Sequence, residues 1–198
     1  MDSKVSQALG QIYTAVGLPV APPLFVWERW VGAWADDYCR QHGAAGISEI
    51  VLGSAVFLFD HVAERVVLAY AVSTPQLHPR DRVRMRGFPD VNVGVRSVLG
   101  PRAFMADRGH FLGHASGGAL DINLFPHRRE LNRGWGEGGK RFRRMERFVG
   151  TQHGLFFFHR PVYDDATWMP AYLEYGIFTD RNEWWRDRFE NKLHGAAS

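Results

Sequence analysis

Apolar side chains recur three or four positions apart in the N-terminal part of the chain. Residues 3–17 show this spacing and precede a Pro-rich stretch, which predicts an amphipathic helix that ends there. Residues 24–42 repeat the spacing with Trp27, Trp30 and Trp34, which predicts a second helix. This aromatic stripe is typical of a packed core face, with an exposed stacking platform as the alternative.

Short apolar runs bounded by polar turns predict strands after these helices. Residues 55–59 and 65–72 are rich in Val, Leu and Phe and are separated by a charged segment. Residues 154–163 and 168–177 flank another polar segment, which predicts a hairpin. Helices followed by hairpins favour an α+β fold with a small central antiparallel sheet and an N-terminal helical layer.

The region between these strand pairs has fewer regular elements. A short strand is expected at 102–108, and a long loop at 111–139, which holds seven glycines. A loop of that length in a compact domain is usually functional. Helical spacing returns at 139–149, and a final helix is expected at 183–193.

The length of 198 residues suits one domain with an added layer. We divide it into an N-terminal helical segment (1–50), a core domain (51–182) and a C-terminal helix or tail (183–198). Cys39 is the single cysteine, so no intramolecular disulfide is possible. The N-terminus lacks the pattern of a secretory signal, and no apolar run is long enough to cross a bilayer, so we expect no membrane partner and either a cytoplasmic protein or export by a non-classical route.

Positive charge is concentrated locally, although the net charge is only +3. Residues 128–147 contain eight cationic side chains and three acidic ones. Residues 78–87 carry alternating arginines, which predict a phosphate-binding strand face or a solvated edge strand. A local cationic patch indicates an anionic polymer as partner more directly than the total charge does.

The segment around residue 110 combines the residue types that cleavage of a phosphodiester requires. His110 is a candidate general base, because a neutral imidazole accepts a proton near pH 7. Asn123 and Asn132 offer neutral oxygens to a hard cation, and Arg108 can contact phosphate. In an extended segment Arg108 and His110 share a face, and Gly109 between them would let a substrate backbone approach.

These residues form an ordered series that resembles the DNA/RNA non-specific endonuclease family, one of the ββα-metal (His-Me finger) nucleases. The resemblance covers about residues 100–177. Its matching segments are Asp107-Arg108-Gly109-His110, Gly117-Gly118, Asn123-Leu124-Phe125-Pro126, Leu131-Asn132-Arg133-Gly134, Met145-Glu146-Arg147, Arg160-Pro161-Val162-Tyr163 and Leu173-Glu174-Tyr175-Gly176.

The resemblance implies a role for each residue of the site. His110 would be the general base, and Asn132 would bind a single Mg²⁺, for which Mn²⁺ is a substitute. Asn123 would support the loop, Arg108 would contact the scissile phosphate, and Glu146 would hold a metal-bound water. The implied substrate is DNA, with RNA as a second candidate.

The glutamate departs from the family pattern. The family places it about eight residues after the metal-binding asparagine, where this chain has Lys140. Residues 135–139 look like an insertion that moves the helix later, so Glu146 is the choice and Glu137 the fallback. Arg133, Lys140 and Arg144 are the candidate contacts to the substrate backbone.

Three alternatives concern the reaction and the biological role. His110 and His114, four residues apart, match the spacing of zinc ligands on a helix and would make the protein a zinc hydrolase. A displaced glutamate would also fit a nucleic-acid-binding protein that has lost catalysis. Related domains occur in scavenging nucleases and in antibacterial toxins or effectors, and a toxin would need a cognate immunity or inhibitor protein.

Overall fold

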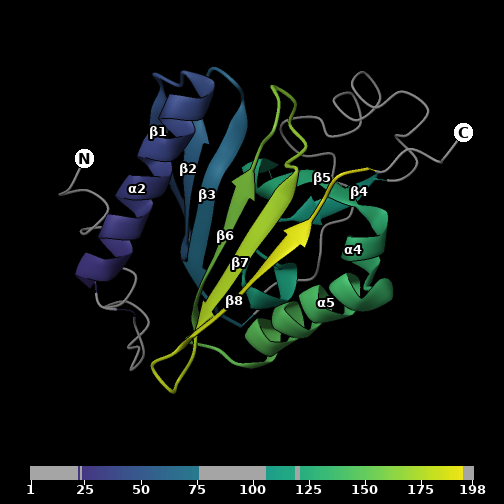
Figure 1. Cartoon of the computed structure of the whole chain (residues 1–198). Helices are drawn as coiled ribbons and strands as arrows, with labels where there is room; N and C mark the ends of the chain where they lie inside the picture. The colour runs from purple at the N-terminus through teal and green to yellow at the C-terminus, as the bar shows by residue number, and fades with distance from the viewer. Residues whose placement is uncertain (1–21, 23, 76–105, 119–120, 194–198) are drawn as a thin grey trace, which may run out of the picture.

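The computed structural model describes residues 22, 24–75, 106–118 and 121–193, which form three layers (Figure 1). One long helix covers one face of a twisted sheet, and a strand pair with two helices covers the other. The helices are α2 (Leu24–His42), α4 (Arg129–Arg133) and α5 (Gly136–Thr151), with 3-10 turns η2 (His114–Ser116) and η3 (Asp121–Asn123). The strands are β1 (Ile47–Leu52), β2 (Ala55–Asp60), β3 (Arg65–Val72), β4 (Ala106–His110), β5 (Leu124–Arg128), β6 (Phe156–Val162), β7 (Tyr172–Phe178) and β8 (Trp184–Glu190).

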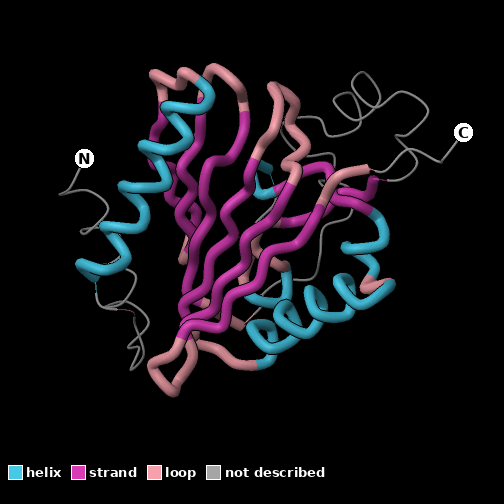
Figure 2. The backbone as a smooth tube through the Cα atoms, in the orientation of Figure 1, coloured by secondary structure: helices cyan, strands magenta, loops and turns pink. Residues whose placement is uncertain are grey.

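Six strands make the central sheet in the order β1-β2-β3-β6-β7-β8, and every neighbouring pair is antiparallel (Figure 2). The other two strands, β4 and β5, form an antiparallel ribbon and, among the described strands, pair with no other. The residues between β3 and β6 therefore carry the ribbon and α5 to one side of the sheet before the chain returns to it. The predicted α+β fold with a central antiparallel sheet is confirmed.

Alternation along the strands supplies the sheet with two apolar faces. In β2, Phe57 and Phe59 join the core that contains α5, whereas Val56 and Leu58 join the core that contains α2. Because both faces are covered, the strand reads in the sequence as a continuous apolar run rather than an alternating one.

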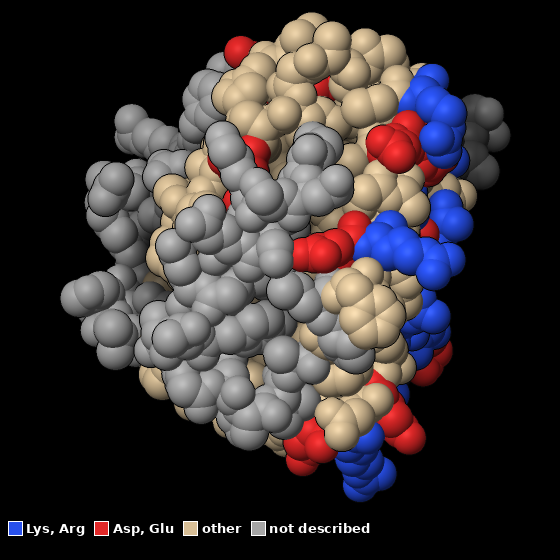
Figure 3. Space-filling view, turned by 90° about the vertical axis from the view of Figure 1, so that its left-hand side faces the viewer, with Lys and Arg blue, Asp and Glu red and all other residues tan. Residues whose placement is uncertain are grey.

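The aromatic stripe of α2 packs against the sheet, as the core interpretation predicts. Trp27 is fully buried, with its ring centroid 4.6 Å from that of Phe156 and 5.2 Å from that of Tyr70. Trp34 lies 5.8 Å from Trp27 by the same measure. The side of the molecule that carries α2 shows Lys and Arg mainly along one border (Figure 3).

The ribbon and α5 make up the layer on the opposite face. Phe142, Met145 and Val149 of α5 are fully buried against the sheet. Asn191, directly after β8, connects the ribbon to the sheet. Its side-chain nitrogen donates to the carbonyl of Pro126, and its side-chain oxygen accepts from the backbone amide of Arg128. Two antiparallel strands followed by a helix are the arrangement that a ββα-metal core implies.

Several predicted elements agree with the structure. The helix expected at 24–42 is α2, and the strands expected at 55–59 and 65–72 are β2 and β3. The predicted hairpin is formed by β6 and β7, and the helix expected at 139–149 is α5, which begins at Gly136. The residues interpreted as an insertion thus form the start of that helix rather than a segment before it.

Other predictions of secondary structure were wrong. The segment 183–193 is not a helix, because Trp184–Glu190 forms β8 and pairs with β7 along its whole length. The segment 1–50 includes the start of strand β1, and the segment 111–139 contains β5 and α4 rather than only loop. Of the strand expected at 102–108, residues 106–108 belong to β4, which continues to His110, and residues 102–105 lie outside the described part of the chain.

The helix expected at 3–17 and the basic segment 78–87 lie outside the described residues. Among the residues that are described, none belongs to a helix long and apolar enough to cross a membrane.

Candidate active site

A cavity of about 470 Å³ lies between the ribbon, the η2 turn, α5 and the facing strands of the sheet. It gathers four of the five residues to which the resemblance assigns a role, and these four come from three different elements. These are Arg108 and His110 of β4, Asn132 of α4 and Glu146 of α5. Side chains more than thirty positions apart in the sequence therefore meet around one space.

Strand β4 places Arg108 and His110 on the same side, as the extended spacing predicts. His110 ends the strand and is only 8% exposed, so it reaches the cavity by one edge. Gly109 has a different role from the one expected. A side chain at Gly109 would collide with the ring of His127, which lies about 2.5 Å from the position of a Cβ atom. The glycine therefore makes room for a buried histidine and not for a substrate backbone.

Asn123 lies behind the cavity and does not line it. Its side-chain oxygen accepts from the amide of Leu112, and its side-chain nitrogen donates to the carbonyl of the same residue, both at 2.8 Å. Its own carbonyl accepts from the amide of Phe111 at 3.0 Å. This fully buried residue thus fixes the loop that follows His110, which is a structural role rather than contact with a substrate.

The side chain of Asn132 is oriented by Asp107. The amide nitrogen of Asn132 donates to the carboxylate of Asp107 at 3.4 Å, which turns the carbonyl oxygen away from that carboxylate. Burial alone would raise the pKa of Asp107, but hydrogen bonds from Arg133, Arg129 and Asn132 hold it below its usual value. Asp107 is therefore an ionised acceptor at neutral pH.

Of the two candidate carboxylates, Glu146 lies in the cavity and Glu137 does not. Glu146 is partly buried, and its Oε2 accepts from Arg143 at 3.2 Å. The side chain of Glu137 is 83% exposed and pairs with Lys140 at the start of α5. The geometry therefore favours Glu146 as the carboxylate beside His110.

Apart from Arg108, the arginines that line the cavity are not the ones chosen from the sequence. Arg143 and Arg147 lie on the face of α5 that borders it, one on each side of Glu146. Arg133 instead donates to Asp107 at 2.7 Å, and it does not line the cavity. Helical spacing from Glu146 would have indicated Arg143, three residues before it, and Arg147 lies one turn after Arg143.

Lys140 and Arg144 are exposed on α5, outside the cavity. They lie four residues apart on the helix, which places them on one face. This face can contact a polymer that extends beyond the cavity. It cannot contact a substrate group bound at the centre of the cavity.

Two side chains from the central sheet complete the cavity and were missed in the sequence. His159 of β6 and Tyr175 of β7 both line it, and each is 2% exposed. Burial lowers the pKa of His159 to about 3, with a smaller contribution from His127, so its imidazole is neutral at physiological pH. His114 also lines the cavity, but from the η2 turn, so it does not share a helix with His110 as a zinc-binding pair would.

The donor set fits a hydrated hard cation. Asn132 offers an oriented carbonyl oxygen, and Glu146 offers a carboxylate in the same cavity. Mg²⁺ prefers oxygen ligands and retains several waters, so a site with few protein ligands suits it. Within the described part of the chain, no group of three or more His, Cys, Asp or Glu side chains is arranged to hold a metal.

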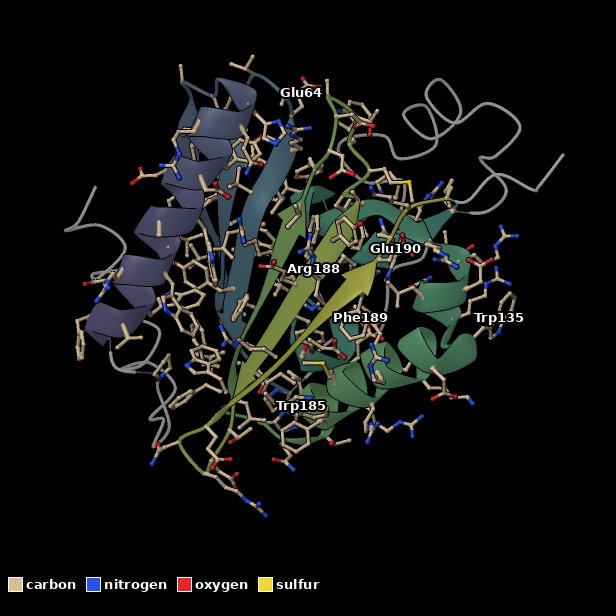
Figure 4. All side chains as sticks on the ribbon, viewed as in Figure 1. Glu64, Trp135, Trp185, Arg188, Phe189 and Glu190 are labelled. Carbon is tan, nitrogen blue, oxygen red and sulfur yellow. The ribbon has the colours of Figure 1, made fainter. Side chains whose placement is uncertain are left out.

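A second groove of about 530 Å³ lies at the start of α5, bordered by β8. Trp135 projects from the junction of α4 and α5, and Arg188 and Glu190 lie along β8 (Figure 4). Its arginines Arg128 and Arg141 are paired with acidic side chains. With these charges compensated, the groove lacks the combination of base, amide oxygen and carboxylate that the first cavity contains.

No family model and no curated protein matches the chain. The solved structures that are similar to it in fold include the following two. One is the Sda1 nuclease with a bound zinc ion, with 14% identity over 77% of this chain and 76% of that chain and a TM-score of 0.45. The other is the EndoG/EndoGI complex, with 12% identity over 83% and 82% and a TM-score of 0.46. Both TM-scores lie below 0.5.

Proposed function

We propose that the protein is a Mg²⁺-dependent, non-specific endonuclease of the DNA/RNA non-specific endonuclease family that hydrolyses phosphodiester bonds in DNA, with RNA as a second substrate. The observation that carries this proposal is the meeting of His110, Asn132 and Glu146 in one cavity bordered by arginines. A base, a cation ligand and positive charge are the three requirements of this hydrolysis.

His110 would act as the general base. A water loses a proton to the imidazole, its oxygen attacks phosphorus, and the bond from phosphorus to the leaving sugar oxygen breaks. The leaving oxygen then takes a proton, so that the products are a phosphomonoester and a free hydroxyl. The near-complete burial of His110 restricts its ring to a single approach, which aligns the base with the attacking water.

Asn132 would hold the Mg²⁺, and Glu146 would accept a hydrogen bond from one of its waters. When bound, Mg²⁺ supplies positive charge that stabilises the transition state, and Mn²⁺ can substitute for it. Asp107 accepts a hydrogen bond from the side-chain nitrogen of Asn132 and would thereby keep the carbonyl oxygen of Asn132 directed toward the metal. Arg108 contributes charge from the same strand as His110.

The substrate would extend along α5. Arg143 and Arg147 would contact phosphate at the cavity, and Lys140 and Arg144 would contact phosphates farther along the strand. Contacts to the phosphate backbone carry no sequence information, so cleavage with little sequence preference is expected.

Plasmid cleavage tests the proposal directly. Purified protein with Mg²⁺ should nick and linearise plasmid DNA, and a chelator should stop it. His110→Ala should reduce the rate by roughly 10²- to 10⁴-fold, the usual contribution of a general base. His153→Ala is the matched control, because His153 is exposed and lies outside the cavity. Equal cleavage by His110→Ala and wild type would overturn the proposal, as would salt-dependent DNA binding without any cleavage.

We further propose a role as an antibacterial toxin that is paired with an inhibitor protein. Expression of the wild-type chain without an inhibitor should degrade the chromosome of the host, whereas His110→Ala should be tolerated. Intact chromosomal DNA under wild-type expression, with active protein in the lysate, would contradict this role and leave the enzymatic proposal standing.

A further inference from the structure

The cavity must supply a proton donor as well as a base if it hydrolyses a phosphodiester. When the bond from phosphorus to the leaving sugar oxygen breaks, its electron pair stays on that oxygen, and a positioned acid that protonates the oxygen lowers the barrier. The attacking and leaving oxygens lie roughly in line, on opposite sides of phosphorus. Because His110 is assigned to the attacking water, the donor must be a second group, on a part of the cavity wall other than the end of β4.

Most of the ionisable groups that line the cavity cannot supply this proton. Arginine does not lose a proton in proteins, which excludes Arg108, Arg143 and Arg147. Burial raises the pKa of Tyr175 well above its usual value, so its hydroxyl is a weak acid. Burial also lowers the pKa of His159 to about 3, so its imidazole carries no proton that it could give up at neutral pH.

Besides His110, the ionisable groups that remain on the described part of this wall are Glu146 and His114. Glu146 accepts from Arg143 at 3.2 Å, so its carboxylate already serves as an acceptor. His114 is partly exposed, which lets its ring exchange protons with water. An imidazole gains and loses its charge near neutral pH, and its two ring nitrogens allow one to act on substrate while the other makes a different contact. His114 is therefore the group on this wall that suits proton donation.

The η2 turn that carries His114 is held by several hydrogen bonds. The backbone amides of Ser116 and Gly118 both donate to the carbonyl of Gly113 at 3.0 Å. The hydroxyl of Ser116 donates to the same carbonyl at 2.8 Å. A side chain at Gly118 would collide with the carbonyl of Leu112, so the chain closes tightly on itself here. The backbone of His114 is thus fixed before any substrate binds, which favours a catalytic role because an acid must be positioned to act.

The η2 turn belongs to a different wall of the cavity from β4. The carbonyl of Ser116 accepts from the amide of Thr74, directly after β3, at 3.2 Å. The side chain of Ala115 packs on α5, where its Cβ lies 3.1 Å from the position that a Cβ atom would take at Gly150. His114 therefore lines the cavity from the place where η2 rests on the last turns of α5, whereas the base lines it from the ribbon.

We propose that His114 is the general acid of this hydrolysis: its protonated imidazole gives a proton to the leaving sugar oxygen as the bond from that oxygen to phosphorus breaks. This rests on the proposed function, because it completes the same reaction. After one cycle His110 has gained a proton and His114 has lost one, and exchange with solvent restores both. The proton transfer takes place in the transition state, so loss of His114 should lower kcat and leave the affinity for DNA unchanged.

A sulfur-substituted substrate tests this assignment, because a thiolate is a weaker base than an alkoxide and leaves without help from an acid. Two end-labelled DNA duplexes each carry sulfur in place of one bridging oxygen, on the 3′ side of a phosphate in the first and on the 5′ side in the second. His114→Gln should cleave ordinary linkages roughly 10²- to 10⁴-fold more slowly than wild type. At the sulfur linkage of one of the duplexes, its rate should return close to that of wild type.

Two further histidine variants are the matched controls. His110→Gln should be slow at oxygen and sulfur linkages alike, since both need an activated water. His153→Gln, exposed and outside the cavity, should match wild type at both. The affinity of His114→Gln for DNA in chelator should equal that of wild type, which also shows that the variant is folded. Equal losses at the oxygen and sulfur linkages of both duplexes would overturn the proposal, as would weaker DNA binding with an unchanged kcat.

Failure of the proposed function gives a different result. If the wild-type chain cleaves neither linkage, or if His110→Gln cleaves as fast as wild type, the nuclease assignment fails and the role of His114 fails with it. If His110→Gln is slow at both linkages while His114→Gln keeps the wild-type rate at the oxygen linkage, the general-acid role alone is overturned.

Discussion

A buried polar network on the α2 side of the central sheet contrasts with a group of buried histidines on the α5 side. On the α2 side, Asp60 accepts from Tyr38 at 2.8 Å and from two backbone amides, and Arg65 donates to Tyr38 and to two carbonyls. On the α5 side, three histidines are buried, and two of them, His127 and His159, are kept neutral by burial.

This difference separates stability from chemistry. A buried polar network with every group partnered rigidifies a core, whereas a buried imidazole kept from water lowers stability. The network of Asp60, Tyr38 and Arg65 on the α2 face is of the first kind, although the indole nitrogen of Trp27 on that face has no hydrogen-bond partner within the described residues. The buried histidines beside the cavity on the α5 face are of the second kind. Polar groups that weaken a core are expected where function requires them, so the comparison agrees with the site proposed on the α5 face.

The largest expected effect concerns the α2 face. Trp27→Ala should lower the free energy of unfolding by about 3–5 kcal/mol, because it empties a fully buried aromatic site. Cleavage per folded molecule should stay unchanged. Urea unfolding measures the first quantity, and Phe25→Ala, on the same helix but 72% exposed, is the control. If folded Trp27→Ala lost cleavage selectively, the α2 face would also serve the reaction. That result would contradict the contrast between the two faces.

A smaller effect is expected from Asp107 on the α5 face. Asp107→Asn should weaken Mg²⁺ binding by roughly 10- to 100-fold, because the acceptor that orients Asn132 is lost. Titration of cleavage against Mg²⁺, together with calorimetry, measures this. Asp37→Asn removes a carboxylate that is also paired with arginines, but on the α2 side, and should leave the Mg²⁺ dependence as it is.

The neutral histidines predict how stability depends on pH. His127 and His159 have pKa values lowered from 6.5 to about 3, so below pH 6.5 the unfolded chain binds protons that the folded protein does not. Stability should therefore be complete above pH 6.5 and fall toward pH 3, by at most about 1.4 kcal/mol per pH unit for each histidine.

Thermal unfolding at several pH values checks this dependence. His159→Gln should reduce the slope by the share of one histidine, and His153→Gln should not, because His153 is exposed. An unchanged slope in His159→Gln would mean that this imidazole is protonated in the folded protein.

The smallest effect is expected from the exposed charges. Arg144→Ala and Lys140→Ala should each weaken DNA binding a few-fold, and each should reduce the slope of log K against log salt by about 0.9. Fluorescence anisotropy at several salt concentrations measures both quantities. Arg40→Ala, an exposed change on the α2 side, should alter neither, and an equal effect there would show that binding is not confined to α5.

Elements with a strong local pattern could be predicted from the sequence. The helix α2 has four aromatic residues at helical spacing, and β2 and β3 are apolar runs around a charged turn. In each case neighbouring residues carry the information, so the pattern holds without knowledge of the rest of the fold.

Elements decided by distant contacts could not be predicted. In β8, Trp185 and Phe189 lie four residues apart, a spacing that fits one face of a helix as well as one face of a strand. Pairing with β7 selects the strand, and the local sequence does not contain that partner. In β5, Pro126 argues against a central strand, but the ribbon has only two strands and tolerates it.

The residues of the candidate site also divide into those that the sequence predicts and those that only the folded chain brings together. His110, Asn132 and Glu146 could be named from one stretch of sequence because they belong to the ribbon and helices that follow one another. Tyr175 and His159 reach the cavity from the central sheet, so only the folded chain brings them there. The partnership of Asp107 with Asn132 spans 25 positions and depends on the turn that α4 makes.

Asn191 clamps the ribbon to the sheet through its side-chain hydrogen bonds. This clamp affects when, during synthesis of the chain, the site becomes complete. This residue holds the ribbon that carries His110, yet it follows the last strand of the sheet. A chain still emerging from the ribosome has made the ribbon and α5 long before it has made β8 and this clamp. The proposed cleavage activity would therefore be delayed until β8 and Asn191 have been synthesised, which gives an inhibitor made nearby time to meet a nuclease whose site is still incomplete.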